Sequence, residues 1–353
     1  MEEDIKLQPI SKPVNAVLIE EELDPTRWIL GANSKIEYEE VNPSGVWLGD
    51  LPTDERQNRG VETWGCTNFW GLSSLEIQLE YKLKHGLLSP RAIAFLNGAN
   101  CQNISYIDAN GKPNLSDKFT FIKTGTKYQR GNYVYKTPDS VRNVGAIPES
   151  MLPFGNPKTW NEFADPAQIT QAMDDLAEEF AEMFETQYET IITAGKTKVE
   201  IEVLIHKHIK QCPLSLAIAT CPGYSTDNPI MGCNMIPNHC VGMVARPEKN
   251  RTIYDSYPEF LKYLDNGYNL PYILKSIIFE KNNNNNETPM KLIKTEESPH
   301  IYLVSEDKKK RIRLIDMPTL EALKQPVVTV ITDAEMAVYE DGGTLVWADR
   351  QID

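Results

Sequence analysis

Apolar residues recur at intervals of three and four in three stretches before residue 210, and this periodicity predicts three helices. The first helix follows Cys66 and ends in the letters KHG, which supply cations and a glycine stop. Cys66 is therefore expected at or near the N-terminus of this helix. The apolar positions of the helix are Phe69, Leu72, Leu75, Leu79 and Leu83.

The second helix is predicted from about 166 to 191, with Asp165 as N-cap and Pro166 as the first helical residue. The third is predicted to begin at Thr197, where Glu200 completes a capping box. The apolar faces consist of Ile169, Met173, Leu176, Phe180, Phe184, Tyr188 and Ile191 in the second helix, and of Ile201, Leu204, Ile205, His208 and Ile209 in the third.

After Pro213 the pattern changes to short apolar runs that are typical of strands: LSLAIAT, HCVGMVA, RTIYDSY and, later, YILKSIIFE. Helices thus precede strands without a regular alternation of the two, which predicts an α+β fold. Residues 97–135 are rich in Gly, Asn and Lys, and we expect them to form surface loops.

A run of five asparagines after Lys281 marks the clearest boundary in the chain, because such a run cannot build a core. We predict an N-terminal arm (1–45), a main domain (46–281), a linker (282–288) and a small β-rich accessory module (289–353). Strands of the module are expected in HIYLV, RIRLI, PVVTVIT and GTLVWA, a hairpin turn in EDKKK and a short helix in MPTLEAL.

The composition, 41% apolar and 24% charged, is that of a globular protein. A formal net charge of −14, from 50 acidic and 36 basic residues, disfavours nucleic acid and anionic membranes as partners. The first letters, MEEDIKLQPISKP, lack the basic and apolar regions of a secretory signal, and no apolar run is long enough to span a bilayer. We therefore expect synthesis in the cytoplasm, a reducing compartment.

The six cysteines are irregularly spaced and contain no C-x-x-C pair, which disfavours a zinc site. We expect neither a metal nor another cofactor, and no disulfide, because disulfides are rare without export. The densest cluster of candidate metal ligands contains Cys212, Cys221, Cys233, Cys240 and His239. Its irregular spacing disfavours a metal site there as well.

Cys66 is either a buried apolar filler or a nucleophile. A thiol becomes a good nucleophile when a helix N-terminus and a nearby imidazole lower its pKa. His239 is the candidate imidazole, because it begins a predicted strand directly after a polar loop containing Pro and Gly. The other histidines fit helix ends or faces, or lie beyond the asparagine run: His85, His206, His208 and His300.

A catalytic imidazole also needs a partner that orients its second ring nitrogen. Asp255 lies on the next predicted strand, sixteen residues after His239, within reach if the two strands pair as a hairpin. The alternative is a turn residue before Pro258. In this order, a cysteine at a helix start, a histidine at a strand start and an aspartate on the neighbouring strand are a signature of thiol acyl transfer.

These residues resemble those of the papain-like cysteine peptidases. DERQNRGVETWGCTNFW is similar to the family's approach from a glutamine to the cysteine that opens its long helix, and PNHCVGMVA is similar to its histidine strand. IYDSY stands where the family usually has an asparagine followed by a serine. VRNVGAIPESMLPF and IKQCPLSLAIA add to the likeness, which covers roughly residues 40 to 281. Residues 116–132 and the Asp-Ser-Tyr motif also resemble compact papain-like proteins of tailed bacteriophages.

The resemblance implies a two-lobed papain-like fold, with Cys66 as nucleophile, His239 as base, Asp255 as orienting residue and Gln57 as side-chain donor of the oxyanion hole. The chain departs from the family's pattern at three points. Gln57 lies nine residues before the cysteine, further than usual, an aspartate replaces the usual asparagine, and Thr67 follows the cysteine where the family has tryptophan.

The sequence therefore predicts a cysteine peptidase that acts through an acyl-enzyme on a polypeptide. Two alternatives stay open. One is a papain-like structural protein of a phage virion with little or no activity, assembled through its N-terminal arm and C-terminal module. The other is a peptidoglycan amidase or endopeptidase that acts on cell-wall peptides with the same Cys-His chemistry.

Overall fold

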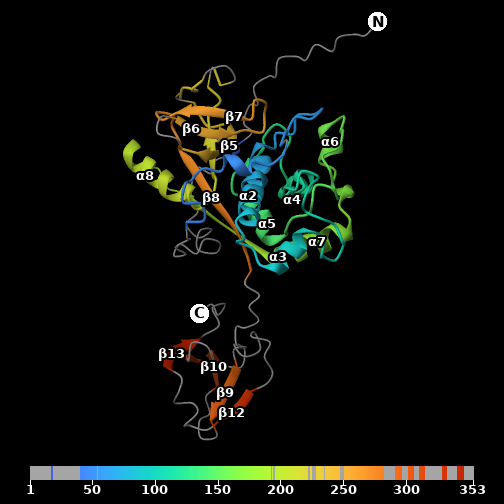
Figure 1. The fold of residues 1–353 in the computed structure, drawn as a ribbon, viewed down its shortest axis with the longest axis vertical. Helices are drawn as coiled ribbons and strands as arrows, with labels where there is room; N and C mark the ends of the chain where they lie inside the picture. Colours follow the sequence, from blue (N-terminus) through green and yellow to red (C-terminus); the bar gives the residue numbers. More distant parts are fainter. Residues whose placement is uncertain are drawn as a thin grey trace, which may run out of the picture. The chain divides into compact units, whose positions relative to one another are not determined.

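The computed structural model (Figure 1) describes residues 40–281 apart from 54, 192, 194, 222, 225–227, 234 and 247–249. It also describes the backbone of strands β1 (Val17–Leu18), β9 (Lys291–Thr295), β10 (Ile301–Ser305), β11 (Lys310–Leu314), β12 (Val328–Ile331) and β13 (Glu340–Leu345). The chain divides into two compact units, residues 1–281 and 282–353.

The first unit begins with a mainly helical lobe. Its elements are η1 (Leu48–Asp50), α2 (Cys66–Lys84), α3 (Pro90–Leu96), α4 (Asp117–Thr124), β2 (Asn132–Tyr133), α5 (Lys136–Asn143), α6 (Trp160–Phe163), η2 (Pro166–Gln168) and α7 (Gln171–Met183). Strand β1 pairs in parallel with β2. A hydrophobic core of this lobe lies between α2 and the helices α3, α4, α5 and α7.

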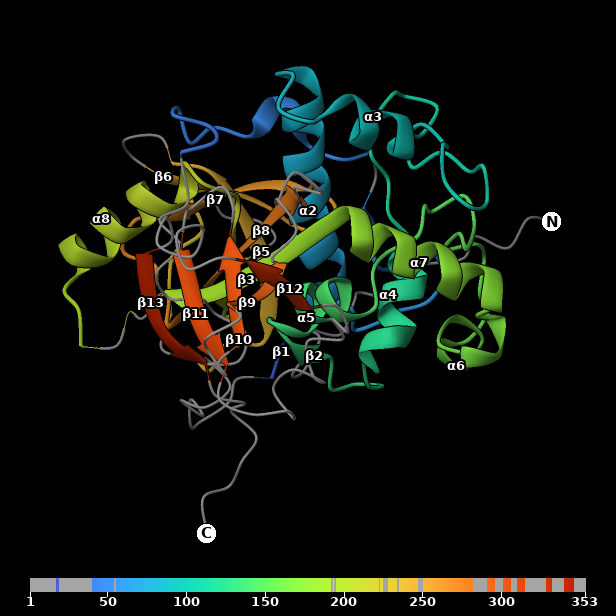
Figure 2. The ribbon, with the colours of Figure 1, turned by 90° about the horizontal axis from the view of Figure 1, so that it is seen from below.

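The second lobe of this unit is a six-stranded antiparallel sheet in the order β3-β8-β4-β5-β6-β7, with helix α8 (Lys198–Ile209) beside it. Its strands are β3 (Phe184–Ile191), β4 (Leu214–Ile218), β5 (His239–Ala245), β6 (Asn250–Tyr254), β7 (Leu261–Asp265) and β8 (Tyr272–Glu280). Figures 1 and 2 show α2 between this sheet and the other helices of the first lobe. The arrangement confirms the predicted two-lobed α+β architecture.

Trp70 fixes the distance between α2 and the sheet. A Cβ atom added to Gly242 of β5 would lie 1.9 Å from the Trp70 ring, so only glycine admits the indole there. The indole Nε1 donates a hydrogen bond to Ser215 Oγ of β4 at 2.7 Å. This contact holds α2, about one turn after Cys66, against the strand that begins with His239.

Two of the three predicted helices are confirmed. Helix α2 begins at Cys66, and α8 follows Thr197, whose side chain forms the predicted capping box with Glu200. The apolar face predicted for α8 is also present, since Ile205 and Ile209 are buried.

The prediction of one helix from about 166 to 191 is wrong. Asp165 and Pro166 open only the short helix η2, and α7 begins after a second N-cap, Thr170, and ends at Met183. The remaining residues form strand β3, which pairs with β8 along its whole length. Phe184, Tyr188 and Ile191 keep the helical spacing of four and three, but pairing with β8 outweighs this periodicity.

The prediction that residues 97–135 form only surface loops is also wrong. Ser116 caps the N-terminus of α4 by accepting a hydrogen bond from the Phe119 N–H, and Gly125 ends the helix in the left-handed conformation. Phe119 and Phe121 of α4 are buried. A helix of eight residues with mixed polar and apolar positions gives too short a pattern to recognise.

The four strands predicted around residues 214–280 are present as β4, β5, β6 and β8. In the second unit, β10, β11 and β12 overlap predicted strands, β13 begins at Glu340, before the predicted strand GTLVWA, and β9 is additional. These strands form a five-stranded sheet in the order β12-β9-β10-β11-β13. The predicted helix in MPTLEAL and the turn in EDKKK lie outside the described residues, and the linker boundaries remain a prediction.

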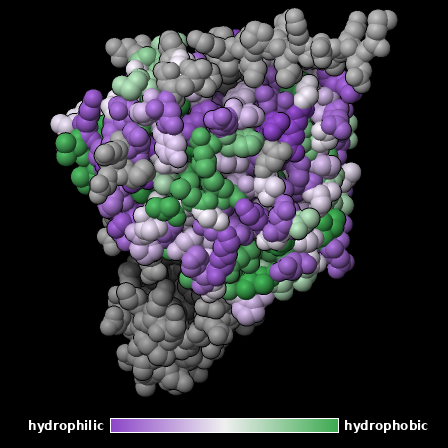
Figure 3. Space-filling model, turned by 45° about the horizontal axis from the view of Figure 1, so that its top comes forward, coloured by the Kyte–Doolittle hydropathy of each residue, from purple (hydrophilic) through white to green (hydrophobic). Residues whose placement is uncertain are grey.

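Figure 3 shows a face of the molecule on which hydrophobic side chains lie among hydrophilic ones, with a larger hydrophobic area near its middle. Large apolar residues of the first unit that are more than half exposed include Val199, Val203, Met231 and Ile236. None of the described helices combines the length and the apolar character that crossing a bilayer requires.

Candidate active site

Cys66 is the first residue of α2, as the sequence predicts, and its side chain is fully buried. Gly65 is the N-cap residue and provides no side-chain hydrogen bond to the helix end. The backbone N–H groups of a first helical turn have no partner within the helix, and the helix dipole adds partial positive charge there. The thiol therefore stands where a helix stabilises negative charge.

His239 is the first residue of β5 and is buried. Its Nε2 atom lies 2.8 Å from Asp255 Oδ1, whereas Nδ1 has no hydrogen bond of ordinary geometry among the described residues. Burial by itself lowers the pKa of His239, but the Asp255 carboxylate and the neighbouring Cys66 thiol together raise that pKa to about 10. The imidazole is thus next to two groups, Asp255 and Cys66, that both favour its charged form.

Asp255 directly follows β6, and its carboxylate is fully buried. Besides His239, it accepts hydrogen bonds from the Tyr224 hydroxyl at 2.7 Å, the Lys262 ammonium at 2.6 Å and the Tyr257 backbone N–H at 3.2 Å. Burial raises the pKa of Asp255, but His239 and Lys262 outweigh it and hold the pKa well below its usual range. The aspartate is therefore ionised and fixed on all sides.

Two members of this network, Tyr224 and Lys262, are absent from the sequence prediction. Lys262 lies on β7, opposite Ile253 of β6, so the tight turn after Asp255 returns it to the carboxylate. A lysine seven residues after the aspartate, across a turn containing proline, was a readable signal. Tyr224 had none, because it belongs to the irregular segment between β4 and β5.

A disulfide joins Cys221 and Cys233, with 5.8 Å between their Cα atoms, so the expectation of no disulfide is wrong. The expectation rested on compartment alone, which does not reveal which cysteines the fold brings into bonding distance. The bridge closes the segment that contains Tyr224, whose ring also meets the His239 ring edge-on, with centroids 5.9 Å apart. It thereby restrains the segment that carries the Tyr224 hydroxyl, a hydrogen-bond donor to Asp255.

Gln57 is fully buried in the loop that precedes α2. Its Nε2 donates hydrogen bonds to Glu62 Oε1 at 2.8 Å and to the Tyr257 hydroxyl oxygen at 2.7 Å, and its Oε1 accepts one from Ser256 Oγ at 2.6 Å. Gln57 therefore touches the segment that follows Asp255, as a site residue should. Both of its amide protons are engaged, so donation to an oxyanion requires the exchange of one of these bonds.

Trp64 adopts an unusual backbone conformation two residues before the nucleophile, with φ of 55°. A bulky residue in the left-handed region is rare, and such strain is concentrated at functional sites. Its N–H donates to Glu62 Oε1 at 2.9 Å, and its ring meets Tyr128 edge-on with centroids 4.6 Å apart. Glu62 thus holds both Gln57 and Trp64 in the loop that leads to Cys66.

Two of the other histidines, His85 and His208, lie apart from this network. His85 caps the end of α2 and contacts the Tyr81 carbonyl, and His208 contacts Gln211. Among the described residues, no group of three or more His, Cys, Asp or Glu side chains is placed to hold a metal ion.

The raised pKa of His239 predicts a specific pH dependence of stability. A folded-state pKa of about 10 against an unfolded value of about 6.5 means that the charged imidazole stabilises the fold fully below pH 6.5. This contribution is lost as the pH rises from about 6.5 to about 10. We expect the urea midpoint of the wild type to fall across this window relative to that of a His239→Ala variant.

The comparison with the variant is needed because other buried groups titrate in the same pH range. Burial raises the pKa of Glu149 to about 7 and lowers that of Lys82 to about 8, and both are present in the two proteins alike. Midpoints that run parallel in wild type and variant from pH 6 to pH 10 would contradict the assignment of the stabilising charge to His239.

No protein-family model and no curated protein matches the sequence. Solved structures of papain-like cysteine proteases resemble the fold. Xylellain from Xylella fastidiosa is 13% identical with a TM-score of 0.45, and the match covers 78% of this chain and 98% of that one. Procathepsin L 3 from the larval midgut of Tenebrio molitor is 12% identical with a TM-score of 0.44, covering 70% and 74%.

The proform of the ragweed pollen allergen Amb a 11, a cysteine protease, is 17% identical with a TM-score of 0.41. The match covers 66% of this chain and 64%, less than two thirds, of that one. These similarities concern the fold. The chemistry of the site rests on the contacts described above.

Proposed function

We propose that the chain is a thiol hydrolase of the papain-like type, with cysteine peptidase activity at Cys66. The observation that supports this best is the buried hydrogen bond between His239 and Asp255, in a site where the Cys66 thiol raises the pKa of the imidazole. Three separate elements, α2, β5 and the turn after β6, supply these side chains. A structural role alone does not require a buried, charged imidazole beside a thiol at a helix start.

In the proposed reaction, the Cys66 thiolate attacks the carbonyl carbon of the scissile amide, and a C–S bond forms while the carbonyl oxygen becomes an oxyanion. The His239 imidazolium then donates its proton to the amide nitrogen, and the C–N bond breaks. In the second half, the neutral His239 takes a proton from water while the water oxygen attacks the acyl carbon. The C–S bond then breaks, which releases the carboxylic acid product and regenerates the thiolate. Asp255 keeps the imidazole oriented and stabilises its charged form.

The oxyanion would be held by the backbone N–H of Cys66 and by the Gln57 amide. The helix start directs the first donor outward, and the second becomes available when Gln57 releases either Glu62 or Tyr257. One such donor contributes about 2.7–4 kcal/mol to the transition state. Glu62 would then act as a positioning residue that sets the direction of the amide.

The substrate class we propose is a polypeptide, with peptidoglycan peptides as the alternative, because both present an amide carbonyl to the same thiolate. Incorporation into a phage virion, through the N-terminal arm and the C-terminal module, is a finer proposal supported only by the sequence resemblance of residues 116–132 and of the Asp-Ser-Tyr motif. An inactive structural protein would keep the fold but not the reactivity of Cys66.

The proposal is tested by labelling the full chain with a peptidyl epoxide probe and with iodoacetamide at pH 6.5, followed by peptide mapping. We expect Cys66 to react fastest although it is buried, because an activated thiol reacts through its thiolate. Cys101 is the internal control because its side chain is exposed. Partial desolvation and the neighbouring Glu179 raise the pKa of its thiol.

Labelling of Cys101 alone, or equal labelling of both, would contradict a reactive Cys66 and favour the structural protein. Incubation with casein and with purified muropeptides then separates the two substrate classes, and a Cys66→Ser variant shows whether any hydrolysis belongs to this chain.

A further inference from the structure

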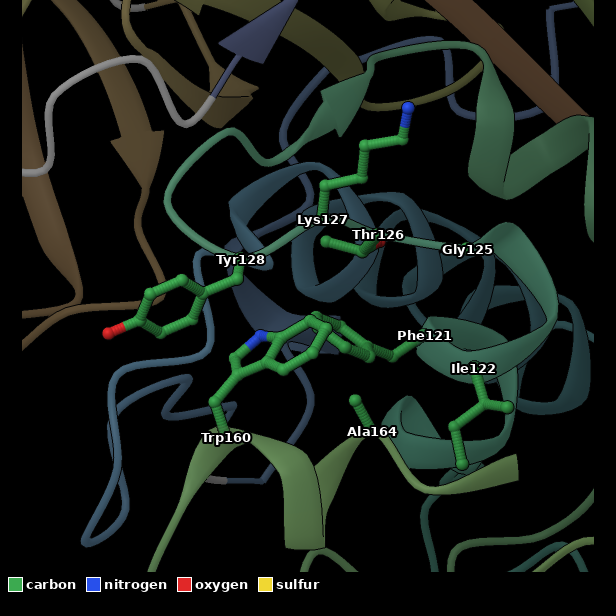
Figure 4. Close-up of a pocket in the computed structure, with 8 residues that line it drawn as sticks. All are labelled: Phe121, Ile122, Gly125, Thr126, Lys127, Tyr128, Trp160 and Ala164. Carbon is green, nitrogen blue, oxygen red and sulfur yellow. The ribbon is translucent and has the colours of Figure 1, made fainter. Parts of the chain in front are cut away.

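A pocket of about 340 Å³ opens in the helical lobe between α4, the loop that follows it and α6. Its walls are formed by Phe121, Ile122, Gly125, Thr126, Lys127, Tyr128, Trp160 and Ala164. Figure 4 shows the aromatic rings of Phe121, Tyr128 and Trp160 gathered on one side of Ala164, while the Lys127 side chain extends away from them.

The pocket adjoins the segment that ends in Cys66 at three points. The Phe121 ring lies so close to Gly65 that a Cβ atom there would be 3.1 Å from it. The Trp160 indole Nε1 donates a hydrogen bond to the Thr63 carbonyl at 3.2 Å, and the Tyr128 ring packs edge-on against Trp64. The pocket walls therefore pack directly against the three residues that precede the nucleophile.

The lining defines the chemical class of the occupant. Three aromatic rings and Ile122 present apolar surface, and Gly125 and Ala164 leave space because they have little or no side chain. Gly125 has φ of 63°, which favours glycine at this position, so the opening follows from the way α4 ends. No lining residue is acidic, and the Lys127 charge at the rim disfavours a cationic side chain. A volume of about 340 Å³ accommodates one aromatic or large aliphatic side chain.

We propose that this pocket binds an aromatic or large aliphatic side chain of the substrate peptide. The Trp64 segment would lie between this side chain and the scissile bond. The inference rests on the proposed peptidase function and adds its specificity. Trp64 and Tyr128, in edge-on contact, form the border between the pocket and the nucleophile, and Trp160 anchors that border through Thr63.

The test fills the pocket without touching the catalytic residues. Ala164 is half-buried at the C-cap of α6 and lines the pocket, so Ala164→Phe places a ring inside it. Ala167, in η2, is exposed and outside the lining, and Ala167→Phe is the matched control. Thermal unfolding of both variants verifies that they fold.

The first measurement is cleavage of a mixed peptide library by wild type and by both variants. We expect the wild type and Ala167→Phe to prefer aromatic or large aliphatic residues over charged ones at one position by roughly ten- to a hundredfold in kcat/KM. The Ala164→Phe variant should lose most of this preference and still cleave peptides that have alanine there. Turnover without such a preference, or an unchanged preference in Ala164→Phe, would overturn the inference and leave the proposed function intact.

The second measurement does not depend on activity. N-acetyl-tryptophan amide and N-acetyl-lysine amide are titrated into a Cys66→Ser chain and followed by NMR saturation transfer, with and without Ala164→Phe. We expect binding of the tryptophan amide only, and its loss in the filled variant. Selective binding without turnover of any peptide by the wild type would overturn the peptidase function while supporting the ligand class. Equal binding of both amides would overturn the latter.

Discussion

Replacing His239 by alanine is expected to lower kcat for peptide hydrolysis by about three to four orders of magnitude, the usual cost of removing one member of such a triad. Among the described residues of the site, the imidazole is the group placed beside the thiol that can both accept its proton and protonate the leaving amine. The Asp255 carboxylate cannot take over, because the Tyr224 hydroxyl and the Lys262 ammonium already hold its other oxygen.

The same substitution should leave the fold largely intact near pH 10, where most of the stabilisation by the charged imidazole is already lost. Asp255 retains its ion pair with Lys262 at 2.6 Å, so no buried carboxylate is left without a partner. Hydrolysis of a fluorogenic peptide is measured with His208→Ala as the control, since His208 contacts only Gln211 among the side-chain partners that the structure describes. A kcat for His239→Ala within tenfold of the wild type would show that His239 is not the acid and base of the reaction.

Elements are predictable from the sequence where a local pattern and its tertiary use agree. Helix α2 combines an apolar stripe with a cationic, glycine-containing end, and α8 has a capping box, so both were predictable without knowledge of their neighbours. Cys66 and His239 each open a regular element, and the start of an element is easier to recognise than a place inside a loop. The candidate triad depended on this regularity.

Elements and contacts are not predictable where partners distant in sequence determine the structure. The β3 segment becomes a strand only because β8, about 90 residues later, pairs with it, and an apolar periodicity cannot contain that information. Tyr224 and the disulfide between Cys221 and Cys233 lie in an irregular connection, where side-chain placement follows from closure of the loop. Gln57 could be singled out only through the family resemblance, and its side-chain hydrogen bonds with Glu62, Ser256 and Tyr257 could not be predicted.

The aspartate also has a structural role that its place in the sequence does not reveal. In the papain-like pattern an asparagine is usual, which suggests that Asp255→Asn should be mild. In this chain, however, Oδ2 of Asp255 accepts from two donors, the Tyr224 hydroxyl and the Lys262 ammonium. An asparagine can keep its oxygen toward His239 only by turning its own N–H groups toward those donors.

Asp255→Asn is therefore expected to lower the free energy of unfolding by about 3 kcal/mol at pH 7, because a largely buried ammonium loses its counter-charge. Lys262 is only 11% exposed, which limits how far water can replace the carboxylate.

A second substitution tests this cause: Asp255→Asn with Lys262→Met removes the unpaired charge and should recover most of the lost stability in urea denaturation. Activity should stay low in both variants, since the His239 pKa falls when the carboxylate is removed and the imidazolium form is lost at lower pH. The pH–rate profile reports that shift directly. If the double variant were less stable than the single one, the Lys262 ion pair would not be the reason for the aspartate, and the hydrogen bond from Tyr224 would have to account for it.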